Sequence, residues 1–207
     1  MMMDLFHKAV KACVMLYQKK EEKKYLNIVG VINSGVKIHY PCIITKNEGD
    51  TIDIGKNSKI LSNGRIQLYS DLVGKPVTFQ MGQGCYVMRR FTALGAGNIR
   101  IGNEVLISDD VMIDTKNHGT NPENSTPYMD QPLCNINDVV IGEGTWIGTK
   151  VTILSGVSIG KKCIIGAGAV VTKNIPDYSI AVGNPAKVIK KYNFITKEWE
   201  RVGDDIP

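Results

Sequence analysis

The chain has 207 residues, of which 43% are hydrophobic and 22% charged, and its formal net charge is +5. This length suits one domain with a continuous core, and no apolar run is long enough to cross a membrane. The positive charge is too small, and too little interleaved with aromatic residues, to indicate a nucleic-acid partner.

Residues 1–27 are predicted to form an amphipathic helix. Apolar residues recur at helical spacing from Leu5 to Tyr17, and a charged stretch from Gln18 to Lys24 follows them. A basic amphipathic helix can lie on a membrane surface. The two glutamates in the charged stretch dilute its positive charge, so docking on the chain's own next domain or on a neighbouring subunit is the favoured interpretation. Peripheral membrane contact is the alternative.

Residues 28–190 are predicted to form a solenoid. From residue 141 an aliphatic residue recurs at every sixth position, and the fifth place of each unit is small or β-branched. A period of six fits neither a helix nor a simple alternating strand, so each unit is a short extended segment followed by a turn. Such units bury their aliphatic side chains only when coils stack on one another. The positions that set this rhythm are Ile141, Ile147, Ile153, Ile159, Ile165 and Val171.

The same step is present earlier in the chain, in shifted phases. Irregular early coils are indicated around Ile32, Val36, Ile38 and Ile44. Shifts of phase indicate turn insertions at the corners of the coils. The regular earlier triplets are Ile54, Ile60 and Ile66, then Met81, Val87 and Ala93, then Ile101, Ile107 and Ile113.

A long loop interrupts the solenoid at residues 114–138. Twenty-eight positions separate Ile113 from Ile141 where six would suffice, so about 22 residues are extruded. A long polar loop in a regular solenoid indicates function. It contains His118, and a neutral imidazole, with an ordinary pKa near ~6.5, suits a general base. His7 and His39 are more typical of structural or solvated histidines, and three histidines so placed make a metal site improbable.

Two further stretches complete the chain. Lys187, Lys190 and Lys191 form a basic cluster that suits nucleotide phosphates, although a charge run is more often a solvated face. Residues 191–207 are predicted to be a C-terminal tail that contains a short strand pair. The five cysteines are scattered and lack CxxC spacing, so we expect free, mostly packed thiols in a cytoplasmic protein.

Three motifs resemble one family. They are the segments 147–149 (Ile-Gly-Thr), 165–176 (Ile-Gly-Ala-Gly-Ala-Val-Val-Thr-Lys-Asn-Ile-Pro) and 181–189 (Ala-Val-Gly-Asn-Pro-Ala-Lys-Val-Ile). These residues are similar to the signature of the hexapeptide-repeat acyltransferases, in the branch that O-acetylates sugars, such as the maltose and galactoside acetyltransferases. The segments Asn117-His118-Gly119 and 128–133 are most like the polysaccharide group.

The resemblance implies a fold, an assembly and a set of site residues. The fold is an all-β solenoid, a left-handed parallel β-helix, with an N-terminal helix and a long loop extruded between coils, and it assembles as a homotrimer with active sites between subunits. His118 matches the catalytic histidine. Acetyl-CoA is the implied co-substrate, with no metal required. The resemblance gives contact roles with acetyl-CoA to Trp146, Thr149, Ala167, Thr172 and Lys173.

Two residues depart from the family pattern. Lys116 stands where many polysaccharide relatives carry a second histidine, and Met88 stands where the simple-sugar relatives carry an asparagine that holds the acceptor. The residue that orients His118 is open, with Asp114, Glu123, Asp130 or a backbone carbonyl as alternatives.

The favoured function is therefore an acetyl-CoA-dependent O-acetyltransferase. It would act on a sugar of a surface polysaccharide or its precursor, in the cytoplasm or at the inner face of the membrane, by direct transfer without an acyl-enzyme. An N-acetyltransferase on an amino-sugar nucleotide is one alternative. A non-catalytic solenoid scaffold is the other.

Overall fold

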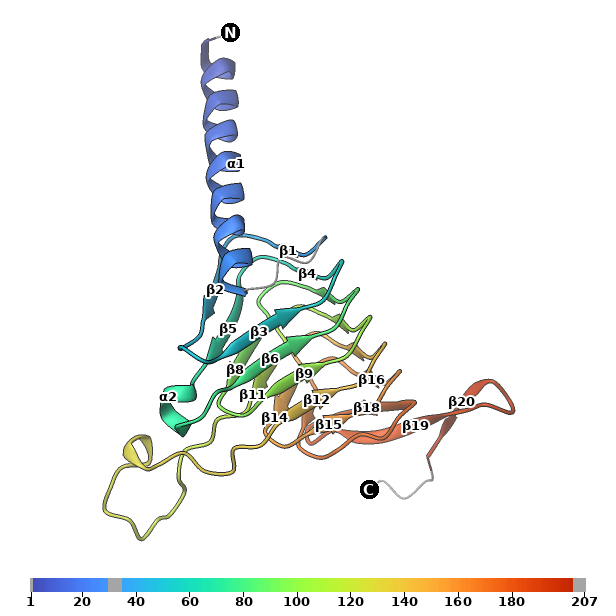
Figure 1. Cartoon of the computed structure of the whole chain (residues 1–207). Coiled ribbons are helices and arrows are strands. Elements are labelled where there is room, and N and C mark those ends of the chain that lie inside the picture. The colour runs from blue at the N-terminus through green and yellow to red at the C-terminus, as the bar shows by residue number, and fades with distance from the viewer. Residues whose placement is uncertain (1, 30–34, 203–207) are drawn as a thin grey trace.

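The computed structural model describes residues 2–29 and 35–202. Its main body is a triangular solenoid in which successive short strands build three faces (Figure 1). Strands that lie 16 to 40 residues apart pair in parallel, as in β16 with β18 and β9 with β12. The predicted solenoid is therefore confirmed.

Each face is one parallel sheet, and we name the faces A, B and C. Face A contains β1 (Lys37–Ile38), β4 (Lys59–Ile60), β7 (Tyr86–Val87), β10 (Leu106–Ile107), β13 (Trp146–Ile147), β16 (Ile164–Ile165) and β18 (Ser179–Val182). Face B contains β2 (Cys42–Thr45), β5 (Gly64–Leu68), β8 (Thr92–Gly95), β11 (Met112–Asp114), β14 (Thr152–Leu154) and β17 (Val170–Val171). Face C contains β3 (Thr51–Ile54), β6 (Thr78–Met81), β9 (Ile99–Ile101), β12 (Val139–Ile141) and β15 (Ser158–Ile159).

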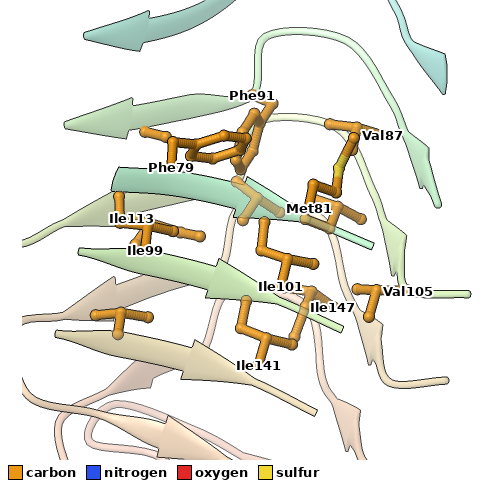
Figure 2. Close-up of a cluster of buried hydrophobic side chains, with 14 of the residues drawn as sticks. Phe79, Met81, Val87, Phe91, Ile99, Ile101, Val105, Ile113, Ile141 and Ile147 are labelled. Carbon is orange, nitrogen blue, oxygen red and sulfur yellow. The ribbon is translucent and has the colours of Figure 1, made fainter. Parts of the chain in front are cut away.

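The core is the column of aliphatic side chains inside the three faces. Every predicted position of the six-residue step from Ile54 to Val171 is buried. The small or β-branched fifth places from Thr145 to Ile175 are buried too. Figure 2 shows part of this column, with Phe79 and Phe91 packed at a ring-centroid distance of 6.5 Å.

The core makes a simple prediction for stability. Ile153→Val removes one methylene from a fully buried side chain and is expected to lower the free energy of unfolding by about 0.5–1.5 kcal/mol. Ile195→Val is the matched control, because Ile195 is 91% exposed, and its effect should stay within about 0.5 kcal/mol. Urea denaturation of both variants measures the difference, and equal effects would contradict the assignment of Ile153 to the core.

Every departure from the six-residue step falls at one edge of the triangle, between faces B and C, which we call the BC edge. At the other two edges the step stays at six, as from Ile147 to Ile153 and from Ile141 to Ile147. At the BC edge the chain inserts the turn 46–50, the excursion 69–77 with helix α2 (Ser70–Val73), the turn 96–98 and the loop 115–138 with the 3-10 helix η1 (Tyr128–Asp130). The BC edge is therefore where this chain departs from a plain solenoid.

The N-terminal helix α1 (Met2–Val29) docks through its C-terminal half, in which the Tyr17 ring packs edge-on against Tyr40 with centroids 5.6 Å apart. Tyr25 and Val29 are buried, and the Tyr25 hydroxyl accepts a hydrogen bond from the Cys42 backbone N–H at 3.0 Å. The rest of α1 projects away from the solenoid (Figure 1). Apolar residues such as Val14 and Leu16 are exposed on it. Docking of the helix on the chain's own solenoid was the first part of the favoured interpretation, and it holds for the C-terminal half of α1, from Tyr17 onward.

The C-terminal region is a hairpin. β19 (Lys187–Asn193) pairs antiparallel with β18 and with β20 (Glu198–Arg201), so the predicted strand pair is present. β19 crosses the expected boundary at residue 190. The helix likewise runs to Val29, two residues beyond its predicted end. Ile32, expected in an early coil, lies outside the described residues. All five cysteines are free, although Cys13 is exposed and only Cys85 and Cys163 are fully buried.

Candidate active site

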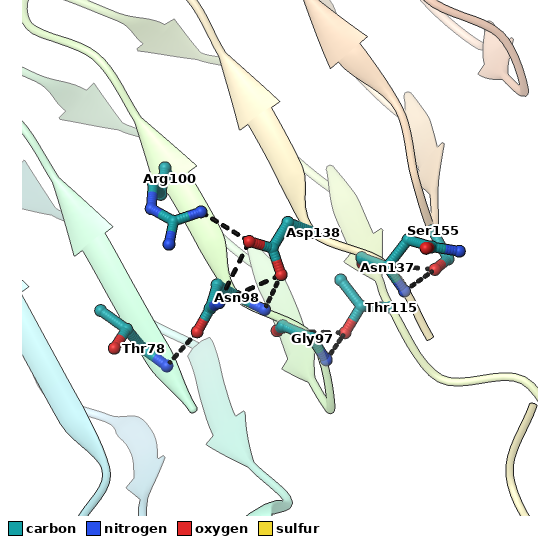
Figure 3. A network of polar contacts seen from close by, with 8 residues as sticks. All are labelled: Thr78, Gly97, Asn98, Arg100, Thr115, Asn137, Asp138 and Ser155. Carbon is teal, nitrogen blue, oxygen red and sulfur yellow. Dashed lines mark hydrogen bonds and ion pairs between the residues drawn. The ribbon is translucent and has the colours of Figure 1, made fainter. Parts of the chain in front are cut away.

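The loop 115–138 begins at a buried threonine, Thr115, which anchors it to the solenoid. Thr115 is fully buried, and its hydroxyl oxygen accepts a hydrogen bond from the Gly97 N–H at 2.9 Å (Figure 3). It accepts a second one from the Ala96 N–H at 2.8 Å. The turn 96–98 on the preceding coil thus holds the outgoing strand. The small insertion in the turn 96–98 therefore lies directly beside the long loop 115–138.

The returning strand is held by Asp138. Its carboxylate accepts hydrogen bonds from the Asn98 backbone N–H at 2.9 Å and from Arg100 Nη1 at 2.6 Å (Figure 3). Burial acts to raise the pKa of this carboxyl, but the hydrogen bonds from Asn98 and Arg100 outweigh it, so the pKa lies below its ordinary value. The Asp138 carboxylate is therefore ionised throughout the neutral range. Thr115 and Asp138 together fix the two ends of the loop.

The neck of the loop fixes the backbone of His118. The Cys134 N–H donates to the Asn117 carbonyl at 2.9 Å, and the Cys134 thiol donates to the His118 carbonyl at 3.2 Å. Further down, Ser155 Oγ donates to the Asn135 carbonyl at 2.8 Å and accepts from the Asn137 N–H at 2.9 Å. These contacts connect the loop to the next coil.

The outer part of the loop is organised around one buried amide. Gln131 Nε2 donates to the carbonyls of Asn121 and Thr126 at 3.2 and 3.0 Å, and its Oε1 accepts from the Asn121 N–H at 3.2 Å. Gly119 packs directly on this side chain, since a Cβ there would lie 2.8 Å from Gln131 Oε1. The Gln131 side chain and the backbone groups that it binds therefore form a polar core inside the loop, next to His118.

The His118 side chain is exposed and lies at a hollow in the loop. Among the described residues, the imidazole makes no hydrogen bond or ion pair. Asp114 accepts a hydrogen bond from the Lys116 N–H at 2.8 Å, while Glu123 and Asp130 lie elsewhere in the loop. None of these three acids forms a hydrogen bond or ion pair with His118. The position of the imidazole thus comes from its backbone, and both ring nitrogens are open to a substrate.

The two departures from the family pattern lie at different edges. Lys116 lies with its ammonium 5.1 Å from the Tyr69 ring centroid and 3.8 Å from Asp114 Oδ2, which connects the loop to the excursion that carries α2. Met88 follows β7 at the AB edge, between faces A and B. The two residues therefore do not meet within one chain.

The residues expected to contact acetyl-CoA fall into two groups. Thr149 and Ala167 lie one above the other at the AB edge, as the pairing of Ile147 with Ile165 requires. The coils approach closely there, since a Cβ on Gly148 would lie 2.8 Å from the Ala167 nitrogen. Trp146 is 47% exposed on face A, and its Nε1 donates to Ser108 Oγ at 3.1 Å.

The basic cluster continues this first group. Lys187 pairs with Val182 and Lys190 with Ile180, so both lysines lie on β19, the strand after β18 on face A. Trp146, Thr149, Ala167, Lys187 and Lys190 therefore form one continuous stretch of surface along face A and the AB edge.

Thr172 and Lys173 form the second group, at the BC edge. The pairing of Ile153 with Val171 places Thr172 beside Leu154, which pairs with Asp114 at the loop root. These two residues are on the His118 side of the molecule, roughly 10 Å along the face from the loop root. The AB edge lies on the other side of face B, roughly 20 Å away along an extended strand. One chain therefore does not bring His118 to Thr149 and Ala167.

Several site residues escape prediction from the sequence. Thr115, Gln131 and Asp138 hold the loop, yet each is a common polar residue in a polar stretch. The sequence gives one indication of these contacts. The step from Ala93 to Ile101 is eight residues in place of six, and the two additional residues lie in the turn that binds Thr115 at the loop root.

The described residues contain no group of three His, Cys, Asp or Glu side chains that could hold a metal ion. Within the same residues, no helix is both long and apolar enough to span a bilayer.

Comparison with known proteins agrees with this geometry. Residues 138–173 match the family model described as bacterial transferase hexapeptide (six repeats). The chain is 35% identical over 169 residues to the Escherichia coli (strain K12) protein named "Putative lipopolysaccharide biosynthesis O-acetyl transferase WbbJ", covering 79% of this chain and 83% of that protein.

Two solved structures share the fold. The maltose O-acetyltransferase of Clostridium difficile 630 superposes with a TM-score of 0.52 at 25% identity, covering 83% of this chain and 75% of that one. AntD, an N-acyltransferase from Bacillus cereus solved with dTDP and 3-hydroxybutyryl-CoA, gives a TM-score of 0.66 at 19% identity, covering 84% and 90%. The fold is thus the left-handed parallel β-helix that the family resemblance implied.

A three-faced β-helix with one long extruded loop places the chain among the hexapeptide-repeat solenoids. The chain belongs to the hexapeptide-repeat transferase family, and it is an acyltransferase.

Proposed function

We propose that the protein transfers an acetyl group from acetyl-CoA to a hydroxyl of a sugar in a surface polysaccharide or its precursor. The observation that carries the proposal is His118, exposed at a hollow on a loop whose two ends and interior are fixed by hydrogen bonds. The similarity to WbbJ, named for O-acetylation in lipopolysaccharide biosynthesis, supports a saccharide acceptor.

His118 acts as the general base in this proposal. The imidazole takes the proton from the sugar hydroxyl, and the oxygen attacks the thioester carbonyl carbon. Backbone N–H groups at a coil edge stabilise the oxyanion that forms. The carbon–sulfur bond then breaks, and the coenzyme A thiolate recovers the proton from the imidazolium. No nucleophile of the protein is needed, because the sugar oxygen forms the new bond itself.

The AB edge fits the acyl donor. Thr149 and Ala167 are small and stand over closely stacked backbone, which leaves room for an extended pantetheine arm. Trp146 offers an exposed ring beside it, and Lys187 and Lys190 offer positive charge for the nucleotide phosphates.

The assembly in this proposal is a homotrimer, because His118 and the AB edge are too far apart to serve one acetyl group within a single chain. The loop of one copy then meets the AB edge of its neighbour, with Thr172 and Lys173 close to the loop root. We place the enzyme in the cytoplasm, where its acyl donor is found. The exposed apolar residues of α1, such as Val14 and Leu16, favour cover by a neighbouring copy over contact with the membrane's inner face, because Glu21 and Glu22 follow them.

The test is thiol release from acetyl-CoA in the presence of a panel of saccharides, followed by mild alkali treatment of the product. We expect saccharide-dependent release and a product that loses its acetyl group in alkali, as an ester does. An alkali-stable product would point to an amide and to the N-acetyltransferase alternative, for which AntD supports the fold alone. Failure of coenzyme A to raise the melting temperature would favour a scaffold.

A further inference from the structure

One hollow in the described structure opens directly beside the base. Its volume is about 490 Å³, which is within the ~300–1,000 Å³ typical of small-molecule sites. It lies within the loop, on the BC side of the molecule, and not along the AB edge that fits the acyl donor. The residues that line it are Asn117, His118, Gly119, Thr120, Tyr128, Cys134 and Asn135.

Tyr128 is the one aromatic ring of this hollow. Its side chain is 57% exposed, and it makes no ring-to-ring contact with any described residue. Several other aromatic side chains of the surface are packed in pairs, such as Tyr178 and Phe194 with ring centroids 4.8 Å apart. An exposed ring without an aromatic partner has a face that a ligand can cover.

The backbone that carries Tyr128 is nevertheless ordered by hydrogen bonds. The Asp130 N–H donates to the Pro127 carbonyl at 2.9 Å across η1. The Gln131 N–H donates to the same carbonyl at 3.2 Å, and the Gln131 side chain is buried behind the turn. The ring is thus presented on a fixed turn and loses little freedom when a ligand binds.

The polar groups of the hollow complement the ring. Asn117 Nδ2 donates to the Asn135 carbonyl at 3.4 Å, and Asn135 Nδ2 lies 3.7 Å from Cys134 Sγ. The amide oxygens of both asparagines have no donor among the described residues, so they can accept hydrogen bonds from hydroxyl groups. Thr120 adds a hydroxyl at the rim. An aromatic face beside several neutral hydrogen-bonding groups suits an uncharged ligand with an apolar face and a rim of hydroxyls.

We propose that this hollow is the acceptor site, in which Tyr128 stacks on the C–H face of a pyranose ring and the amides of Asn117 and Asn135 bind its hydroxyls. The inference rests on the proposed function and names the residues that hold its substrate. A pyranose has both features that the hollow complements. Its position beside His118 places one hydroxyl of the bound ring at the imidazole.

The test compares Tyr128→Ala with Tyr128→Phe and with Met129→Ala. Met129 is the matched control, because it is the next residue of η1, is 76% exposed, and does not line the hollow. For Tyr128→Ala we expect the KM for the saccharide to rise roughly 5- to 20-fold while the KM for acetyl-CoA stays the same. Tyr128→Phe keeps the ring and should stay within about twofold of the wild type, as should Met129→Ala.

Saccharide binding is measured in parallel by saturation-transfer NMR with methyl pyranosides, so that the acceptor site and the reaction are tested separately. Binding that depends on Tyr128 supports the site even if no acetyl transfer is found, in which case the proposed function alone fails. Acetyl transfer with an unchanged saccharide KM in Tyr128→Ala overturns the site alone. An equal rise in Met129→Ala also overturns it. Absence of both binding and transfer overturns both.

Discussion

Replacing His118 with alanine is expected to lower the kcat for acetyl transfer by about 10²- to 10⁴-fold, the range that a positioned general base contributes. The imidazole is exposed and makes no hydrogen bond to the described part of the chain, so its removal leaves no buried partner unsatisfied. The melting temperature should therefore equal that of the wild type. Thiol release at saturating saccharide measures the first quantity, and thermal unfolding measures the second.

His39→Ala is the matched control for this prediction. His39 is also accessible to solvent, directly follows β1, and lies with its Nδ1 3.5 Å from Glu22 Oε1 of α1. β1 and α1 are at the end of the solenoid away from the extruded loop (Figure 1). We expect it to keep wild-type kcat. Full turnover in His118→Ala, or an equal loss in His39→Ala, would contradict the role of His118 as base.

Replacing Gln131 with leucine is expected to lower kcat by roughly 10- to 100-fold without unfolding the solenoid. The change removes the donor for the carbonyls of Asn121 and Thr126 and the acceptor for the Asn121 N–H. Each buried polar group left without a partner costs about 1–3 kcal/mol of stability. The loop is therefore expected to change its conformation. Because Gly119 packs on Gln131, the change reaches the backbone beside His118.

Two comparisons sharpen the Gln131 prediction. The melting temperature should hardly change, because the loop lies outside the stacked coils and opens independently of them. Glu123→Gln is the control, since Glu123 is an exposed acid of the same loop that does not contact His118, and its kcat should equal that of the wild type. Wild-type kcat in Gln131→Leu would show that the polar core of the loop does not position the base.

The solenoid was predictable because its signal is repeated. Each coil reports the same physical requirement, an aliphatic side chain turned inward and a tight corner after it, so positions such as Ile147 and Ile165 support one another. The extruded loop was predictable for the same reason, as a gap of known size in a regular series. The resemblance then identified His118.

The internal order of the loop and the division of the donor residues were not predictable. Gln131 and Thr115 act through hydrogen bonds to backbone groups that are distant in sequence, and such contacts leave no periodic trace. Likewise, Thr149 and Thr172 look like members of one set along the chain. They lie at different edges because a coil of 18 residues turns through three faces. Only the folded chain separates them.

The loop with His118 lies at the BC edge, whereas Thr149 and Ala167 lie at the AB edge. The central claim is therefore that His118 of one copy acts on acetyl-CoA bound at the AB edge of another copy. The direct measurement is the activity of mixed assemblies formed from two inactive variants, His118→Ala and Ala167→Trp, with Ala167→Ser as the control for a small side chain at that corner. If the site lies between copies, mixing in equal amounts restores roughly a quarter of the wild-type activity, because about one interface in four then combines an intact loop with an intact corner. If each site lies within one chain, no mixed assembly contains an intact site. Activity that stays at the level of the separate variants, in assemblies shown to be mixed, would contradict the account.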